Sequence, residues 1–165
     1  MVDFVTYPHP ALSTNAKRRP LDDAMLVAGQ KLLSAATEAN AYGLAAAHIG
    51  LIEPVIVVSI SSDPAERDYR VMYIPRASAV AADTEVGTEG SVSLPGIEVP
   101  VVRPVWAEIV YETAQDVTET LRLEGFAARV VLHEIDQMEG LFFLRRVSSV
   151  KRDTALRKFQ KMTRL

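Results

Sequence analysis

The segment from Phe126 to Leu141, which reads FAARVVLHEIDQMEGL, constrains the fold of this chain more than any other. Its apolar residues recur at helical spacing, no proline interrupts it, and Gly140 stands near its end. It therefore predicts an amphipathic helix with a glycine stop, on which His133 and position 137 share one face with Glu134 beside them. In the HExxH pattern two histidines at this spacing bind a metal ion and the glutamate moves protons. Here Gln137 stands at the second histidine position, so the segment predicts the scaffold of a metal hydrolase with one ligand missing.

Composition sets the outer limits of the problem. With 165 residues, 48% of them hydrophobic and 24% charged, the chain is expected to form one domain over residues 1–165. A net charge of −3 gives no general case for nucleic-acid binding, and the absence of cysteine excludes disulfides and thiolate ligands. The opening MVDFVTYPHP lacks the pattern of a signal peptide, and no apolar run reaches the ~20 residues of a membrane helix. We therefore expect a cytoplasmic protein with no membrane partner.

The remaining periodicities predict an α+β domain. Two further helices are expected, one near the start and one in the basic tail, together with a buried strand, an extended stretch, a long alternating run and a hairpin partner for it. In that order these segments are about Asp22–Asn40, Val150–Leu165, Val55–Ile60, Val71–Ile74, Val99–Thr113 and Thr118–Leu123. Helices at the start, middle and end of a run of strands predict mixed or antiparallel sheets packed around the central helix.

Three motifs in register resemble those of peptide deformylases. The segment GLAAAHIG is similar to their GLAAPQIG, EGSVSLP to their EGCLSVP, and HEIDQMEGLFF to their HEIDHLDGxLF. The YPHPAL opening and the Arg103-Pro104 pair extend the similarity over nearly the whole chain. The resemblance implies the deformylase fold, with Ser91 close to His133 and with part of a sheet formed by Glu89–Ser93.

The resemblance also implies an activity and a site. Deformylases remove the formyl group from N-terminal methionine, using iron or zinc held by one cysteine and two histidines. Carried over position by position, the metal ligands become Ser91, His133 and Gln137, and the catalytic groups become Glu134 as base with His48 and Val92 at the formyl oxygen. The residues expected to contact an N-formylmethionyl peptide are Tyr42, Gly43, Glu89 and Arg129.

The changed ligands predict that the metal reaction is lost or strongly reduced. A serine hydroxyl stays protonated near neutral pH and a glutamine carbonyl is a weak neutral donor, whereas zinc and iron(II) prefer thiolate and imidazole. Arg129, one turn before His133, adds a positive charge that also disfavours a cation. We expect no cofactor, and a protein retained for binding or regulation rather than as an enzyme.

An active enzyme is the alternative. The family's glutamine and histidine are exchanged between His48 and Gln137, so two imidazoles remain, and with Glu134 and Glu89 they could hold zinc or iron in a rebuilt site. The plain interpretations stay open beside it. His48 can be a hydrogen-bonded core residue, His133 and Glu134 a polar pair without metal, and Ser91 a structural serine. A Ser–His mechanism would require an orienting acid and an oxyanion hole.

The tail carries six basic residues and one acid, Asp153, between positions 150 and 165. A solvated helix face explains this pattern. The resemblance offers a second explanation, because the C-terminal helix of bacterial deformylases docks on the ribosome. A third hypothesis is therefore a ribosome-associated factor that competes with true deformylases.

Overall fold

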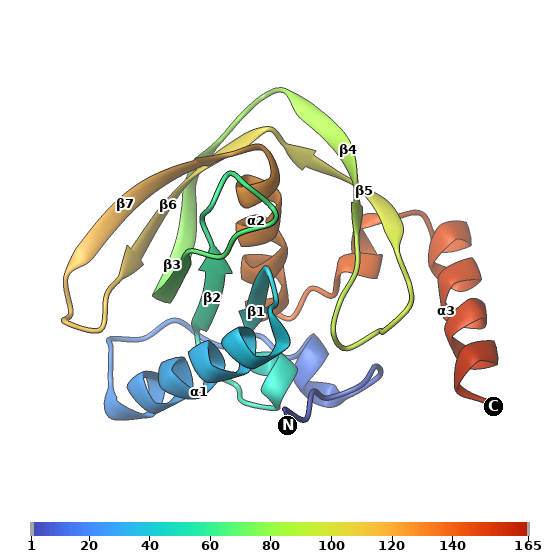
Figure 1. The fold of residues 1–165 in the computed structure, drawn as a ribbon, viewed down its shortest axis with the longest axis horizontal. Helices are drawn as coiled ribbons and strands as arrows, with labels where there is room; N and C mark the ends of the chain where they lie inside the picture. Colours follow the sequence, from blue (N-terminus) through green and yellow to red (C-terminus); the bar gives the residue numbers. More distant parts are fainter. Residues whose placement is uncertain (1, 165) are drawn as a thin grey trace.

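Seven strands in two antiparallel sheets surround one central helix (Figure 1), in a computed structural model that describes residues 2–164. The strands are β1 (Gly43–Ala45), β2 (Val55–Ser59), β3 (Tyr69–Val80), β4 (Thr84–Glu89), β5 (Val99–Pro104), β6 (Trp106–Glu112) and β7 (Thr118–Glu124). The α-helices are α1 (Asp23–Ala39), α2 (Gly125–Met138) and α3 (Ser149–Thr163), and short 3-10 turns are η1 (Pro10–Ser13), η2 (Ala46–Ile49) and η3 (Phe143–Arg146). The predicted α+β architecture with a central helix is confirmed.

The larger sheet has the strand order β1-β2-β3-β6-β7 and is covered on both faces at β2. Val55 and Val57 pack with α1, while Ile56 and Val58 pack with α2. All five residues of β2 are buried. A strand buried on both faces has no solvent side, which explains why this stretch reads as a continuous apolar run.

Helix α1 begins where its sequence signals place it. The Asp22 carboxylate accepts a hydrogen bond from the Met25 N–H at 2.9 Å, and Asn40 ends the helix in the left-handed conformation with φ 51°. These two caps bound the helix within one residue of the predicted Asp22–Asn40 range.

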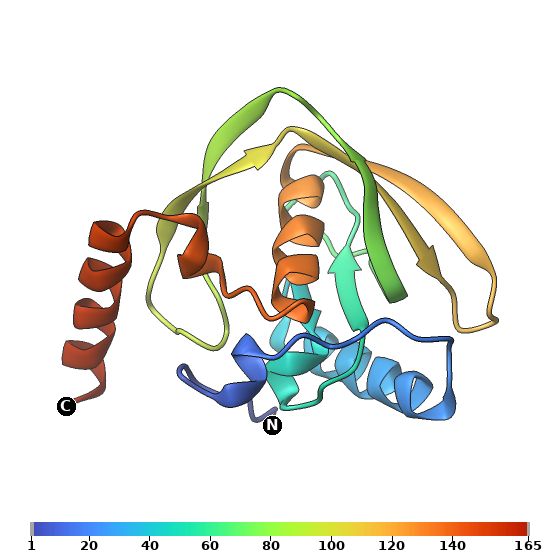
Figure 2. The same ribbon diagram turned by 180° about the vertical axis from the view of Figure 1, so that it is seen from behind.

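Helix α2 lies between the two sheets, as both ribbon views show (Figures 1 and 2). Its apolar stripe is buried against the larger sheet, and the polar residues His133, Glu134 and Gln137 are buried on the side that remains. Gly140 follows with φ +85°, which is the conformation expected of the predicted stop.

The smaller sheet consists of β4 and β5. In the chain these two strands lie between β3 and β6, which are neighbours in the larger sheet. At its base the Ala81 N–H donates to the Trp106 carbonyl at 3.0 Å, and the Val105 N–H donates to the Asp83 carbonyl at 3.1 Å. The predicted single run Val99–Thr113 was therefore wrong in one respect, because the chain changes sheet at Val105. The expected strand over Glu89–Ser93 was also placed too late, since only Glu89 belongs to β4.

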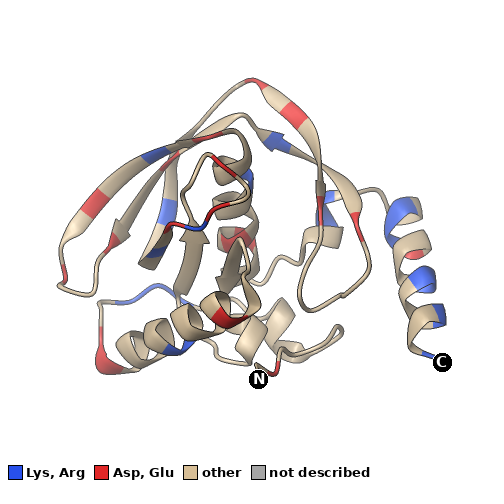
Figure 3. Cartoon of the chain, viewed as in Figure 1, with Lys and Arg blue, Asp and Glu red and all other residues tan. Residues whose placement is uncertain are grey.

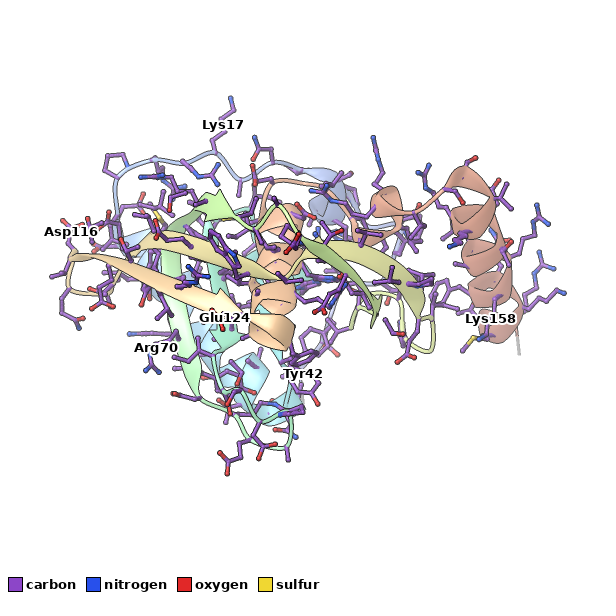
Figure 4. All side chains as sticks on the ribbon, turned by 90° about the horizontal axis from the view of Figure 1, so that it is seen from above. Lys17, Tyr42, Arg70, Asp116, Glu124 and Lys158 are labelled. Carbon is purple, nitrogen blue, oxygen red and sulfur yellow. The ribbon has the colours of Figure 1, made fainter. Side chains whose placement is uncertain are left out.

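Helix α3 stands at the edge of the molecule beyond the β4–β5 hairpin (Figure 1). Its Ala155 and Phe159 are buried, in one cluster with Phe142, Phe143 and the inner residues of β5. Lysine and arginine residues dominate its outward surface (Figure 3), and Lys158 points away from the rest of the chain (Figure 4). In the part of the chain that the structure describes, no helix is long and apolar enough to cross a membrane.

Candidate ligand-binding cavity and metal site

A cavity of about 330 Å³ opens beside α2. Its walls come from three parts of the chain: the β1–η2 region, the end of β4 with the turn after it, and the first turns of α2. Nine residues assigned to the site from the sequence line this cavity: Tyr42, Gly43, His48, Glu89, Ser91, Val92, Arg129, His133 and Glu134. Ser91 and His133 thus face one space, while Gln137 does not line it.

Glu89 is the electrostatic centre of the cavity floor. Its carboxylate accepts two hydrogen bonds from Arg103, both at 2.9 Å, and one from Arg129 at 2.8 Å. The His133 Nδ1 lies 2.8 Å from the Oε1 of the same carboxylate. Burial alone would raise the pKa of Glu89, but the hydrogen bonds from Arg103 and His133 lower it to about 2. Glu89 is therefore ionised at neutral pH.

The bond to Glu89 orients the His133 ring. An ionised carboxylate can only accept, so the Nδ1 of His133 carries the proton and Nε2 is the nitrogen left for other contacts. Burial opposes the charged imidazole, but the charges of Glu134 and Glu89 and the hydrogen bond to Glu89 raise the pKa of His133. A carboxylate at the second nitrogen is also the usual support of a metal-binding histidine. The His133 ring is therefore oriented as the ring of a metal-binding histidine would be.

His48 and Glu134 form an incompletely bonded pair. The His48 Nδ1 accepts the Ala45 N–H at 3.0 Å, so its Nε2 carries the proton, and this Nε2 is buried without a partner among the described residues. Burial and the nearby charge of His133 lower the pKa of His48 to about 3, which keeps the ring neutral. The Glu134 Oε1 lies 3.8 Å from the His48 Nδ1 and also has no partner among those residues. The contact is therefore not an ion pair.

Glu134 makes stability depend on pH. Burial, together with the negative charge of Glu89, raises the pKa of Glu134 from 4.5 to about 7, although the charge of His133 opposes the shift. Because the pKa of Glu134 is raised in the folded state, its contribution to the free energy of unfolding is fully present below pH 4.5 and is lost as the pH rises through 7. At pH 8 we expect the free energy of unfolding of Glu134→Gln, measured with urea, to exceed that of the unaltered chain by about 2–3 kcal/mol. At pH 5 the two chains should differ little. An equal effect of the substitution at both pH values would contradict this; Glu98→Gln, at an exposed cavity residue, is the control.

The other two predicted metal ligands are engaged elsewhere. The Gln137 Nε2 donates to the Leu12 carbonyl at 2.8 Å, and Gln137 is only 2% exposed. The Ser91 Oγ accepts the Ser93 N–H at 3.1 Å in a local turn. Within residues 2–164, no three His, Cys, Asp or Glu side chains are grouped so that they could hold a metal ion. The donor set at these positions does not fit iron or zinc, which require stronger ligands than a hydroxyl and an amide.

Two aromatic side chains form the rim of the cavity. Tyr42 and Phe126 are 38% and 40% exposed and meet edge to face, with ring centroids 4.7 Å apart. The Arg67 guanidinium lies 3.9 Å from the centre of the Tyr42 ring and also donates to the Asn40 carbonyl. Tyr42 is labelled in Figure 4. The rim thus offers a fixed apolar surface at the entrance to a polar floor.

Sequence reasoning missed the role of Arg103, which appeared only as part of a motif. Arg103 is 3% exposed and bonds both Glu89 and Asp136 of α2, the latter at 2.6 Å. The signal was present in the alternation of β5, where Val99, Val101 and Arg103 point inward. An arginine at an inward strand position requires a buried acid as partner.

Comparison with known proteins gives a consistent result. The family model described as polypeptide deformylase matches residues 1–153. A protein named peptide deformylase-like from Rhizobium meliloti is 32% identical over 162 residues, covering 98% of this chain and 92% of that protein. A peptide deformylase from Rickettsia typhi is 34% identical, covering 79% of this chain and 78% of that protein. The crystal structure of peptide deformylase from Ehrlichia chaffeensis superposes with a TM-score of 0.88 at 23% identity, covering 99% and 97% of the two chains.

Proposed function

This chain belongs to the polypeptide deformylase family, and we propose that it binds N-formylmethionyl peptides without a metal ion and without deformylating them at a family-like rate. Peptide deformylases are hydrolases that use a divalent metal. The observation that carries the proposal is the commitment of Gln137 to the Leu12 carbonyl, together with the turn contact of Ser91. Of the three ligand positions, this leaves one imidazole, that of His133, facing the cavity.

The cavity keeps features suited to a peptide end. The Val92 N–H makes no hydrogen bond with the described residues, and the cavity is lined by this residue and by His48. The apolar rim of Tyr42 and Phe126 can pack against a side chain, while Glu134 offers a carboxyl group to an amide N–H. These groups support binding of an acylated peptide and require no ion.

The test measures metal content and deformylation on the same preparation. We expect far less than one equivalent of iron or zinc, together with measurable calorimetric binding of a formyl-Met peptide. Metal ions contribute several kcal/mol to such hydrolyses, so turnover should lie on the order of 10³-fold or more below that of an authentic deformylase. Full occupancy with ordinary turnover would instead support a rebuilt centre using His48 and His133. In that case His48→Ala should abolish metal binding.

We further propose that α3 binds the ribosome through its basic face. Six lysine and arginine side chains occur on α3 and at its C-cap, against one acid: Lys151, Arg152, Arg157, Lys158, Lys161 and Arg164. Binding through phosphates weakens as salt rises. We expect co-sedimentation with ribosomes that is lost at high salt and reduced in the Lys158→Glu, Lys161→Glu variant. Lys31→Glu, at an exposed position of α1, is the control, and equal losses in both variants would argue against α3.

A further inference from the structure

Arg67 lies outside the cavity but contacts one of the two aromatic residues of its rim. Its guanidinium lies over the Tyr42 ring, 3.9 Å from the ring centre. The same group donates to the Asn40 carbonyl, through Nε at 3.2 Å and through Nη2 at 3.0 Å. Tyr42 lines the cavity, whereas Arg67 does not. Arg67 can therefore act on a ligand in the cavity mainly through the Tyr42 ring.

The guanidinium is itself held in place by the loop between β2 and β3. Its Nη1 donates to the carbonyls of Pro64 at 2.8 Å and Glu66 at 3.0 Å. The loop is closed at its base, where the Ile60 N–H donates to the Asp68 carbonyl at 2.9 Å. Arginine suits this place because its donors lie in one rigid plane that can also stack on an aromatic ring. The cation over the ring is thus fixed on both sides, by the loop and by the end of α1.

The main chain beneath the Tyr42 ring is also fixed. Three successive carbonyl groups precede β1, and the first of them accepts the guanidinium. The carbonyl of Ala41 accepts the Tyr69 hydroxyl at 2.6 Å, and that of Tyr42 accepts the Ser59 N–H at 2.7 Å. With the backbone held in this way, the side-chain torsions are the freedom that remains to Tyr42. Those torsions are limited by Phe126, which meets the ring edge to face, and by Arg67.

We propose that Arg67 is a positioning residue, which fixes the Tyr42 ring as a preformed wall at the mouth of the cavity. Tyr42 is 38% exposed, so without the guanidinium its ring would sample other rotamers and would have to be ordered when a ligand binds. The effect on peptide affinity rests on the proposed function. The effect on the ring does not, because it is present in the chain without a ligand.

The first arm of the test observes the ring without a ligand. The ring current of Phe126 should displace the NMR signals of Tyr42, which Tyr42→Leu identifies among the five tyrosines. In Arg67→Met these signals should move towards those of an unstructured tyrosine, and unchanged signals would overturn the proposal. Arg122→Met is the matched control. Arg122 lies over the Trp106 ring in the same way, at 4.1 Å, and Trp106 does not line the cavity.

The second arm measures the calorimetric affinity for a formyl-Met-Ala peptide. Arg67→Met should bind it about 2- to 10-fold more weakly than the unaltered chain, because binding must then order the ring. Arg122→Met should bind it with unchanged affinity. In Tyr42→Leu, which already lacks the ring, the addition of Arg67→Met should change affinity by less than about twofold. Equal losses with and without the Tyr42 ring would show that Arg67 only supports the loop, and would overturn the proposal.

Arg67→Lys separates the charge from the geometry. Lysine keeps a cation near the ring but cannot donate to three carbonyls from one plane, so both readouts should lie between those of the unaltered chain and Arg67→Met. If Arg67→Met does not fold, Arg67→Lys replaces it in both arms. Failure of the proposed function is seen separately, as absence of peptide binding by the unaltered chain. The NMR signals of Tyr42 then decide whether Arg67 positions the ring.

Discussion

The variant Ser91→Cys, Gln137→His is expected to take up about one equivalent of zinc or iron, while the unaltered chain takes up little. Both positions then carry ligands that these metals prefer, and the oriented His133 ring supplies the third. Each strong ligand adds several kcal/mol to metal affinity, so a gain of at least about 10³-fold is expected. The cost is the bond from Gln137 to the Leu12 carbonyl, worth about 1 kcal/mol. Metal analysis and competition with a chromogenic chelator measure the gain.

Turnover in this variant should stay low until position 48 is also changed. The His48 ring is held by the Ala45 N–H and its Nε2 is buried, so it is poorly placed to donate to an oxygen in the cavity. Loss of one such donor costs on the order of 10²–10³ in rate, and adding His48→Gln should recover part of it without changing metal affinity much.

Ser93→Cys with Gln137→His is the matched control, because Ser93 is buried two residues away and does not line the cavity. If the Ser91→Cys, Gln137→His variant binds no metal, either the charge of Arg129 or a displaced backbone is responsible. Addition of Arg129→Met separates the two explanations. Continued absence of metal in that chain would show that the family's ligand positions do not correspond to these residues.

The largest loss of stability is expected for Glu89→Gln. The substitution leaves the guanidinium groups of Arg103 and Arg129 buried without their shared carboxylate. Breaking a buried ion pair by removal of one partner costs about 3–5 kcal/mol, which corresponds to a fall in Tm of roughly 6–20 °C for a chain of this length. Thermal and urea unfolding measure it, with Glu98→Gln as the control.

Glu89 also makes the free energy of unfolding decrease in acid. The pKa of Glu89 is lowered from 4.5 to about 2 in the folded chain, so its contribution is complete above pH 4.5 and disappears as the pH falls towards 2. It amounts to about 3 kcal/mol. In Glu89→Gln this part of the acid dependence should be missing. An unchanged slope between pH 5 and pH 3 would show that the carboxylate is not ionised in the folded state.

Much of the fold could be predicted because its signals are local. The caps of α1, the stripe of α2, the glycine stop at Gly140 and the run of β2 all depend on neighbouring residues. The change of sheet at Val105 could not be predicted in this way. Alternation continues through Pro104 into β6, and only the pairing of β4 with β5 divides it.

Nine of the ten residues assigned to the site line one cavity, but their hydrogen bonds could not be predicted from the sequence. Motifs in register bring Ser91, His133 and Glu134 to one cavity, as expected from the resemblance. Gln137 is turned away because η1 presents the Leu12 carbonyl to it, and that contact joins residues 125 positions apart. The tautomer of His48 likewise depends on the Ala45 N–H. Such choices follow from tertiary placement, which spacing along the chain does not contain.

The β4–β5 hairpin has a consequence for how the cavity opens. It leaves the larger sheet between β3 and β6, which remain paired beneath it, and bonds at Ala81 and Val105 close its base. We therefore expect this wall of the cavity to open locally while the register of the larger sheet stays intact. The wall has an opening free energy of its own, set by a few buried ionic bonds and one apolar cluster. Faster amide exchange in β4 than in β2 would be the signature of this local opening. Peptide entry would then require local rather than global unfolding.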